Sequence, residues 1–216
     1  HGFRYDSQED FSRNVLGEIG YVKSEMRDLS GYVSATMKTE DFQIVYNEYE
    51  HFLRSRGKID FDDMLVFTYE LFTQRDDIID MWRNKFRYIL IDEFQDINSI
   101  QYETIRMLAG KRKNIFVVGD DDQSIYGFRG AAPAIMKRFP EDFPGTVIEY
   151  LNVNYRCSYD VVECSKRVIK NNADRYDKNL QSEYIPGQSD RVHIVKVKDV
   201  AEQNRKIVDR IRELNN

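Results

Sequence analysis

Cysteine, histidine and long apolar segments are scarce in this sequence. The two cysteines, Cys157 and Cys164, and the three scattered histidines offer neither a disulfide framework nor a CxxC zinc motif. No apolar run approaches the roughly 20 residues that a membrane-spanning helix needs. We therefore expect a protein of a reducing cytoplasm that has no membrane partner.

An excess of positive charge is also missing. The 216 residues carry a formal net charge of −5, and 32% of them are charged while 41% are hydrophobic. This composition is typical of a soluble globular protein, and it argues against one that coats DNA by bulk electrostatics. It is compatible with a local DNA-binding groove that uses stacking side chains.

Neither an initiating methionine nor a signal peptide opens the chain, which begins with His1, Gly2, Phe3 and Arg4. No apolar segment of the kind that signal peptides carry follows these residues. We interpret this beginning as a cut within a longer protein.

Hydrophobic periodicity predicts a helical part followed by an α/β part. Helical spacing runs through residues 7–56 with a break at Gly31, and Asp60 has the position of an N-cap for a helix that reaches Phe72. Apolar runs predict strands, the first two of them buried on both faces, at residues 86–91, 114–118, 146–151 and 192–197. Helices are expected at residues 100–108, 135–136, 161–169 and 200–214. Strands that alternate with helices indicate a parallel sheet, so the predicted fold class is α/β with a helical segment in front.

An acidic segment follows the first predicted strand. It contains Asp92, Glu93, Gln95 and Asp96, and ligands bind at the carboxyl ends of strands in open α/β sheets. An aspartate at this place can hold Mg²⁺ through water while the ion bridges nucleotide phosphates, and the next acid can orient or deprotonate an attacking water. Two acids after a strand are more often a solvated loop, but the Gln-Asp pair that follows them favours the catalytic interpretation.

A second polar segment, GDDDQSIYGFRGA at residues 119–131, follows the second predicted strand. Its three consecutive acids repel one another, which indicates a nearby cation, a basic partner or simple solvent exposure. Gln123 offers both a donor and an acceptor to a phosphate or a water. Tyr126, Phe128 and Arg129 have the composition of a base-stacking surface, although core packing of the two rings is equally compatible with these residues taken alone.

A third segment, Asn154-Tyr155-Arg156, follows the third predicted strand. Arg156 can serve as an arginine finger, and Tyr155 can serve as a platform for a purine. Taken alone, these residues carry a weak signal, and an ordinary surface arginine is the better explanation of Arg156.

Taken together, DEFQD at residues 92–96, GDDDQSIYGFRGA at residues 119–131 and NYRCS at residues 154–158 resemble motifs II, III and IV of superfamily-1 DNA helicases of the UvrD/PcrA/Rep type. The resemblance covers about residues 40–216, and the residues before it fit a helical insertion by position. It implies RecA-like motor domains in three portions. These are the helical part of the inserted subdomain at residues 1–57, the C-terminal half of the first motor domain at residues 58–149, and the N-terminal part of the second at residues 150–216.

The resemblance also implies a role for each motif residue. Asp92 would organise Mg²⁺ through water, and Glu93 would activate the hydrolytic water. Gln95 and Gln123 would connect the γ-phosphate to the DNA site.

The remaining roles concern the nucleotide and the DNA. Tyr155 would stack on the adenine, and Arg156 would contact the γ-phosphate and complete the catalytic set with the two acids and Gln123. Tyr126, Phe128 and Arg129 would line the path of the single strand.

The implied cofactors are ATP and Mg²⁺, the implied partners are single-stranded DNA and junctions of single- and double-stranded DNA, and the implied location is the bacterial cytoplasm. The resemblance further implies unwinding in the 3′ to 5′ direction. However, the chain contains no GxxxxGK[ST] phosphate-binding loop and none of the later helicase motifs. We therefore expect an internal part of a helicase that has no ATPase activity by itself.

Three other interpretations stay open. The chain can belong to the motor of a helicase–nuclease of the RecB/AddA kind, or to a nucleic-acid-binding module that never hydrolyses ATP. A phosphoacceptor receiver domain would explain the acidic cluster, but it leaves residues 123–131 without a role.

Overall fold

The computed structural model describes residues 7–125, 133–173, 175–185 and 192–215. The chain divides into two compact units, His1–Val147 and Ile148–Asn216. Both units mix helices with short parallel strands, as an α/β fold class requires. None of the helices in the described part of the chain combines the length and the apolar character that a membrane crossing needs.

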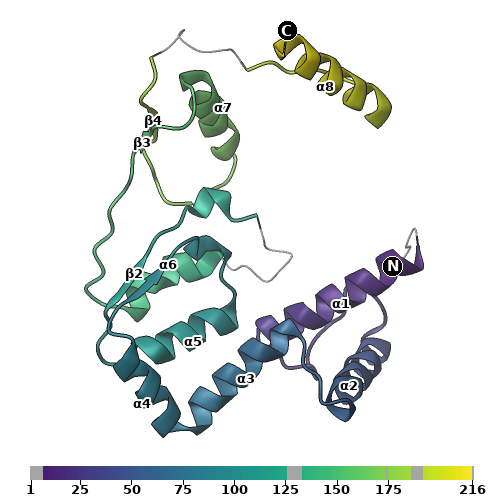
Figure 1. Cartoon of the computed structure of the whole chain (residues 1–216), viewed down its shortest axis with the longest axis vertical. Helices are drawn as coiled ribbons and strands as arrows, with labels where there is room; N and C mark the ends of the chain where they lie inside the picture. The colour runs from purple at the N-terminus through teal and green to yellow at the C-terminus, as the bar shows by residue number, and fades with distance from the viewer. Residues whose placement is uncertain (1–6, 126–132, 174, 186–191, 216) are drawn as a thin grey trace. The chain divides into compact units, whose positions relative to one another are not determined.

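Three helices form the beginning of the first unit (Figure 1): α1 at Gln8–Ser24, α2 at Thr39–Ser55 and α3 at Phe61–Gln74. The first begins after Ser7, whose hydroxyl accepts a hydrogen bond from the Asp10 N–H. Its apolar face packs against α2 in a small core. The fully buried members of this core are Val15, Ile19, Val22 and Phe42.

A buried ammonium group fastens these helices together. Lys23 Nζ on α1 lies 2.7 Å from Asp60 Oδ2, 2.8 Å from Asp63 Oδ1 and 2.5 Å from Glu50 Oε1. Burial alone would lower the pKa of Lys23, but the hydrogen bonds to these three carboxylates raise it above its ordinary value. Asp60 also forms a capping box with Asp63, which confirms the predicted N-cap of α3.

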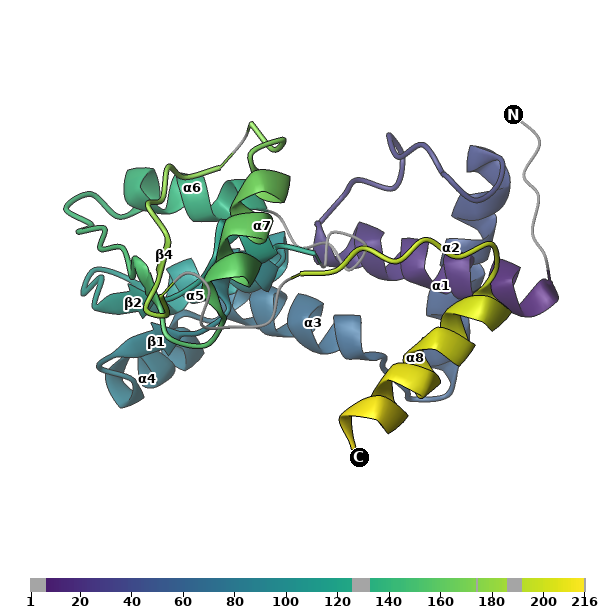
Figure 2. The same cartoon turned by 90° about the horizontal axis from the view of Figure 1, so that it is seen from above.

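The sheet of the first unit consists of two parallel strands joined by a helix. Strand β1 spans Ile89–Ile91, helix α5 spans Ser99–Ala109 and strand β2 spans Ile115–Val117, with Ile89 opposite Ile115 and Ile91 opposite Val117. Helix α4 at Asp76–Lys85 precedes the sheet and lies beside α5 in both views (Figures 1 and 2), and helix α6 at Pro133–Asp142 follows it. The predicted alternation of strand and helix is confirmed, whereas α4 was not predicted.

One face of this sheet packs on a core and the other does not. The first and last residues of each strand pack against the core. The core consists of Phe94, Tyr102, Ala109, Ile135, Phe139 and Phe143. Leu90 and Phe116 point to the other face, where they are 72% and 61% exposed. The prediction that both strands are buried on two faces is therefore wrong, because no described element covers this second face.

The second unit contains a shorter parallel pair, β3 at Val153–Asn154 and β4 at Gln181–Ser182, with helix α7 at Tyr159–Ile169 beside β4. Helix α8 spans Val200–Leu214 and agrees with its prediction. The strands predicted at residues 146–151 and 192–197 are wrong, since neither segment forms a strand. Val147 and Ile194 are 78% and 90% exposed, and an apolar run becomes a strand only where a neighbouring strand takes up its backbone hydrogen bonds.

Candidate functional site

The loops that follow β1 and β2 lie at one edge of the sheet, because the strands are parallel and their carboxyl ends point the same way. We call residues 92–96 and 118–123 the carboxyl edge. Asp92 and Glu93 are both exposed there, and the Glu93 N–H donates to Asp92 Oδ1 at 2.9 Å. Glu93 has φ 51° and ψ 43°, a left-handed conformation that turns the chain sharply into the 3₁₀ turn Phe94–Asp96.

Gln95 joins the two loops of the carboxyl edge. Its side chain is buried, with 2% of the residue exposed. Oε1 accepts a hydrogen bond from the Asp120 N–H at 3.0 Å, and Nε2 donates to Glu93 Oε2 at 2.8 Å. The carboxylate of Glu93 is thereby fixed relative to the backbone of the loop after β2. The role that the resemblance implies for Gln95, a connection between the γ-phosphate and the DNA site, stays a prediction, and the contacts seen here are those to Glu93 and Asp120.

Gly119 allows the two loops to approach this closely. The Phe94 N–H donates to the Val118 carbonyl at 2.9 Å. A Cβ atom at residue 119 would lie 2.7 Å from Gln95 Oε1 and 3.1 Å from Phe94 N. Only glycine fits there without moving the backbone. The predicted roles included none for this glycine, although a glycine directly before a polar loop is a signal of close backbone approach.

The acidic run after β2 is folded into a 3₁₀ turn, Asp121–Gln123, that its own side chains stabilise. Asp120 Oδ1 accepts from the Asp122 N–H at 3.2 Å, and Asp120 Oδ2 accepts from Gln123 Nε2 at 2.7 Å. These hydrogen bonds offset part of the repulsion that the sequence predicts. Gln123 is exposed, and its side chain is held beside the edge on which Glu93 lies.

Two groups of carboxylates bring their oxygen atoms within 4.8 Å of one another, one formed by Asp120, Asp121 and Asp122 and the other by Glu50, Asp60 and Asp63. In the second group the Lys23 ammonium already takes the position of a cation. Asp92 is exposed and uses one oxygen to accept the Glu93 N–H. The carboxyl edge therefore offers only oxygen ligands, which is the donor set that Mg²⁺ prefers.

The third predicted segment forms an exposed turn after β3 in the second unit. Asn154 Oδ1 accepts hydrogen bonds from the N–H groups of Arg156 at 3.0 Å and Cys157 at 2.7 Å. The Tyr184 hydroxyl donates to the Tyr155 carbonyl at 3.3 Å. Tyr155 is 69% exposed and Arg156 is also exposed, so the turn presents both side chains to solvent. Asn154 therefore orients the turn, a role not predicted from the sequence although asparagine is typical of such turns.

The structure thus places the predicted site residues in two groups, each within one unit. Asp92, Glu93, Gln95 and Gln123 meet at the carboxyl edge, and Tyr155 and Arg156 lie on the turn after β3. Tyr126, Phe128 and Arg129 lie outside the described residues.

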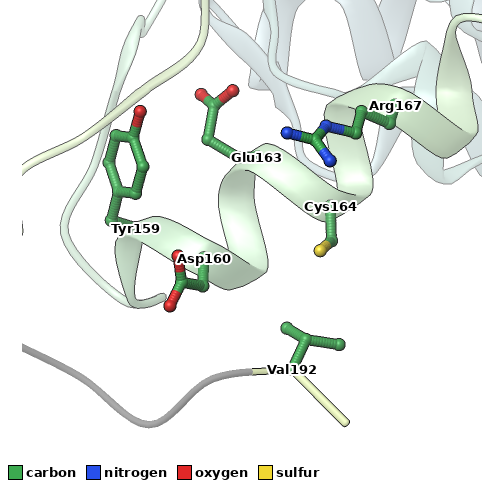
Figure 3. Close-up of a pocket in the computed structure, with 6 residues that line it drawn as sticks. All are labelled: Tyr159, Asp160, Glu163, Cys164, Arg167 and Val192. Carbon is green, nitrogen blue, oxygen red and sulfur yellow. The ribbon is translucent and has the colours of Figure 1, made fainter. Parts of the chain in front are cut away.

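Two hollows are lined by none of these residues. One of about 270 Å³ runs along α7 and mixes charges of both signs with a thiol (Figure 3); it is lined by Tyr159, Asp160, Glu163, Cys164, Arg167 and Val192. The other, of about 510 Å³, lies between α1, α3 and the start of α5, and Asp62 and Asp96 contribute carboxyl groups to it. Burial raises the pKa of Asp62. Neither hollow includes a residue to which the sequence assigned a catalytic role.

Comparison with known proteins places these features in a family context. The model of the UvrD/REP helicase N-terminal domain matches residues 11–144. A putative ATP-dependent DNA helicase YjcD of Bacillus subtilis strain 168 is 45% identical over 183 residues, which are 82% of this chain and 23% of that protein.

Two further relatives match a comparable share of this chain. A probable DNA helicase II homolog of Rickettsia conorii is 41% identical over 80% of this chain and 26% of its own length. An ATP-dependent DNA helicase PcrA of Staphylococcus aureus is 35% identical over 85% of this chain and 25% of its own length. The chain therefore spans about a quarter of the length of the curated relatives it matches.

Proposed function

The chain belongs to the UvrD/REP helicase family, and from this premise we propose that it is part of an ATP-dependent DNA helicase. The longer protein would couple ATP hydrolysis to movement along single-stranded DNA and would unwind duplexes in the 3′ to 5′ direction. Single-stranded DNA and its junctions with duplex DNA would be its partners. The observation that carries this proposal is the Gln95 amide, which joins Glu93 to the loop after β2.

We infer that the sheet of the first unit is part of a RecA-like motor domain. Two parallel strands connected by α5 carry their polar loops at the carboxyl edge, where nucleotides bind in open α/β sheets. Residues 1–57 would be the inserted helical subdomain, residues 58–149 the rest of the first motor domain, and residues 150–216 the beginning of the second. The exposed face with Leu90 and Phe116 supports this inference, because a larger parallel sheet is covered on both faces.

The proposed hydrolysis depends on geometry at the carboxyl edge. Bound Mg²⁺ would neutralise the phosphate charge, and Asp92 would hold the ion through water. Glu93 would accept a proton from the attacking water. The hydrogen bond from Gln95 Nε2 to Glu93 Oε2 fixes one carboxylate oxygen and leaves the other for the water.

The remaining assigned residues would sense the nucleotide or the DNA. Gln123, held by Asp120, would contact the γ-phosphate from the loop after β2. Arg156 would add a guanidinium to the same phosphate, and Tyr155 would stack on the adenine; their exposure on the turn after β3 makes both available. The single-strand path assigned to residues 126–129 rests on the sequence alone.

The 216 residues contain no GxxxxGK[ST] loop. The backbone N–H groups and the lysine of that loop hold the phosphates in helicases of this type. We propose that this chain alone does not hydrolyse ATP and that the longer protein does so when single-stranded DNA is bound.

The proposal is tested by Glu93→Gln in the longer protein. The change keeps the size of the side chain and an oxygen that accepts from Gln95, but it removes the base. We expect nucleotide binding to persist and DNA-stimulated hydrolysis to fall by about 10²-fold or more. Glu70→Gln, at an exposed position of α3, is the matched control and should leave the rate unchanged. A loss of less than about tenfold, roughly 1.4 kcal/mol in the barrier, would remove Glu93 from the role of base.

A further inference from the structure

The opposite edge of the same sheet, where β1 and β2 begin, carries a cluster of positive charge. We call residues 82–88 and 111–114 the amino edge. Its six cationic side chains come from the end of α4, the link to β1 and the loop before β2. They are Arg83, Lys85, Arg87, Lys111, Arg112 and Lys113.

Hydrogen bonds join the two segments of the amino edge into one surface. Arg112 Nη1 donates to the Arg83 carbonyl at 2.7 Å, and its Nη2 donates to Asn84 Oδ1 at 2.9 Å. Asn114 Nδ2 donates to the Arg87 carbonyl at 2.9 Å. These hydrogen bonds fix the two segments relative to each other, so the fold keeps the positive charges close together.

Most of this charge is not neutralised. Arg83 pairs with Asp80 at 2.9 Å. Within the described part of the chain, Lys85, Arg87, Lys111 and Lys113 form no ion pair, and all four are exposed. In a chain with a net charge of −5, four such cations on one connected surface repel one another without a compensating acid. A polyanion would remove that repulsion.

Aromatic rings lie among these cations. Trp82 and Phe86 are stacked, with ring centroids 5.6 Å apart and an angle of 15° between the planes, and Lys85 Nζ lies 4.7 Å from the Trp82 centroid. Tyr88, the last residue before β1, is 69% exposed, and Phe86 is 45% exposed. Large exposed rings beside unpaired cations are the composition of a surface that stacks unpaired bases and follows a phosphate backbone.

We propose that the amino edge binds single-stranded DNA, with Arg87, Lys111 and Lys113 on phosphates and Tyr88 and Phe86 on bases. This contact is separate from the carboxyl edge and uses none of residues 126–129, and it needs neither ATP nor the second unit. A single strand fits better than a duplex, because paired bases do not expose the faces that these rings would stack on. It fits better than an acidic protein segment, which would use the cations and leave the rings without a role.

The proposal is tested with the 216-residue chain and a fluorescein-labelled oligothymidine, by fluorescence anisotropy at several salt concentrations. The variant Arg87→Gln/Lys111→Gln/Lys113→Gln removes three charges from the amino edge. Its control, Lys196→Gln/Lys198→Gln/Arg205→Gln, removes three charges from exposed positions of the second unit. We expect the amino-edge variant to bind at least tenfold more weakly and its salt dependence to fall by about two in log–log slope, since each contact to a single strand contributes about 0.7.

A second variant separates stacking from charge. Tyr88→Ala should weaken oligothymidine binding about tenfold and leave the salt slope unchanged, while a duplex of the same length should be bound more weakly than the single strand and should not respond to Tyr88→Ala. Circular dichroism melts exclude unfolding as the cause of a loss. If the amino-edge variant loses no more affinity than its control, the proposal is wrong. If Tyr88→Ala has no effect, or if duplex and single strand bind equally, the single-strand occupant is wrong.

This result is independent of the proposed motor activity. The measurement uses neither ATP nor hydrolysis. If the chain binds DNA through the amino edge while the longer protein shows no ATPase activity, only the proposed motor activity is refuted. Conversely, Glu93→Gln could lower ATP hydrolysis as expected while the amino-edge variant binds oligothymidine as tightly as the unchanged chain. That result would refute only the second DNA contact.

Discussion

The two edges of one small sheet have opposite charge and opposite construction. At the carboxyl edge, a buried amide and a glycine without room for a Cβ hold two loops against each other. At the amino edge, most side chains are exposed and the segments are joined mainly through carbonyl groups. The carboxyl edge contains the six acids Asp92, Glu93, Asp96, Asp120, Asp121 and Asp122, and the amino edge contains six cations.

The strands between these edges are three residues long, so the edges are separated by about 10 Å at roughly 3.3 Å per residue. That distance is close to one Debye length in physiological salt, and the two fields are therefore only partly screened from each other. The two ends of the same strands therefore differ in kind. The carboxyl edge holds its side chains in a fixed geometry, and the amino edge is an exposed charged surface suited to binding. Changes at the carboxyl edge should alter rates, and changes at the amino edge should alter binding.

The largest expected effect is on the rate, and it tests whether the second unit contributes to the carboxyl edge. Arg156→Lys keeps the charge and loses the planar fork of the guanidinium. In the longer protein we expect ATP hydrolysis to fall by about 10³- to 10⁵-fold, the value of an arginine finger, while affinity for single-stranded DNA stays nearly constant. Arg205→Lys, on the exposed helix α8, is the control. A hydrolysis rate that does not change would return Arg156 to an ordinary surface residue.

Much of the carboxyl edge could be predicted from the sequence, because it follows from local order. Apolar runs that end in acids predicted both strands of the first sheet and the polar loops after them. The contact between Gln95 and the Asp120 N–H joins residues 25 positions apart and depends on the register of the strands. Sequence order alone could indicate that these segments are functional, but it could not identify the atoms that meet.

The strand predictions failed where a tertiary partner decides the outcome. Residues 146–151 and 192–197 have apolar, branched side chains that favour strands. Both segments are largely exposed, and neither is paired with a strand in the described part of the chain. By contrast, the N-cap at Asp60 was predicted correctly, since a helix end depends on residues within one turn of it.

The effect of intermediate size is on the free energy of unfolding, measured with urea on this chain. It tests whether the loops of the carboxyl edge are packed as closely as the structure shows. Gly119→Ala places a Cβ against Gln95 Oε1 and the Phe94 amide, so it should lower the free energy of unfolding by about 1–3 kcal/mol. Gly17→Ala is the matched control, because nothing lies within 4 Å of its Cβ and the position is inside α1. The control should raise stability by up to about 1 kcal/mol. Equal effects of the two changes would show that the loops are not held closely together.

The smallest expected effect concerns backbone strain, which both edges contain. Among the described non-glycine residues, positive φ occurs at Met26, Glu93 and Lys113, so each edge has one such residue. A left-handed conformation costs an L-residue about 1–2 kcal/mol relative to glycine, although glycine also has more freedom in the unfolded chain. Lys113→Gly should therefore stabilise the chain by about 0.5–1 kcal/mol, measured by urea unfolding.

The same substitution should weaken the binding of oligothymidine about threefold, since it removes one phosphate contact of the amino edge. A lysine at a position where glycine would avoid the backbone strain is consistent with a role other than folding. Lys58→Gly is the control, because Lys58 is exposed and its φ is not positive; it should lower stability and leave binding unchanged. If Lys113→Gly gains stability without any loss of affinity, the lysine is not a DNA contact, and the amino edge would have to bind through its other cations.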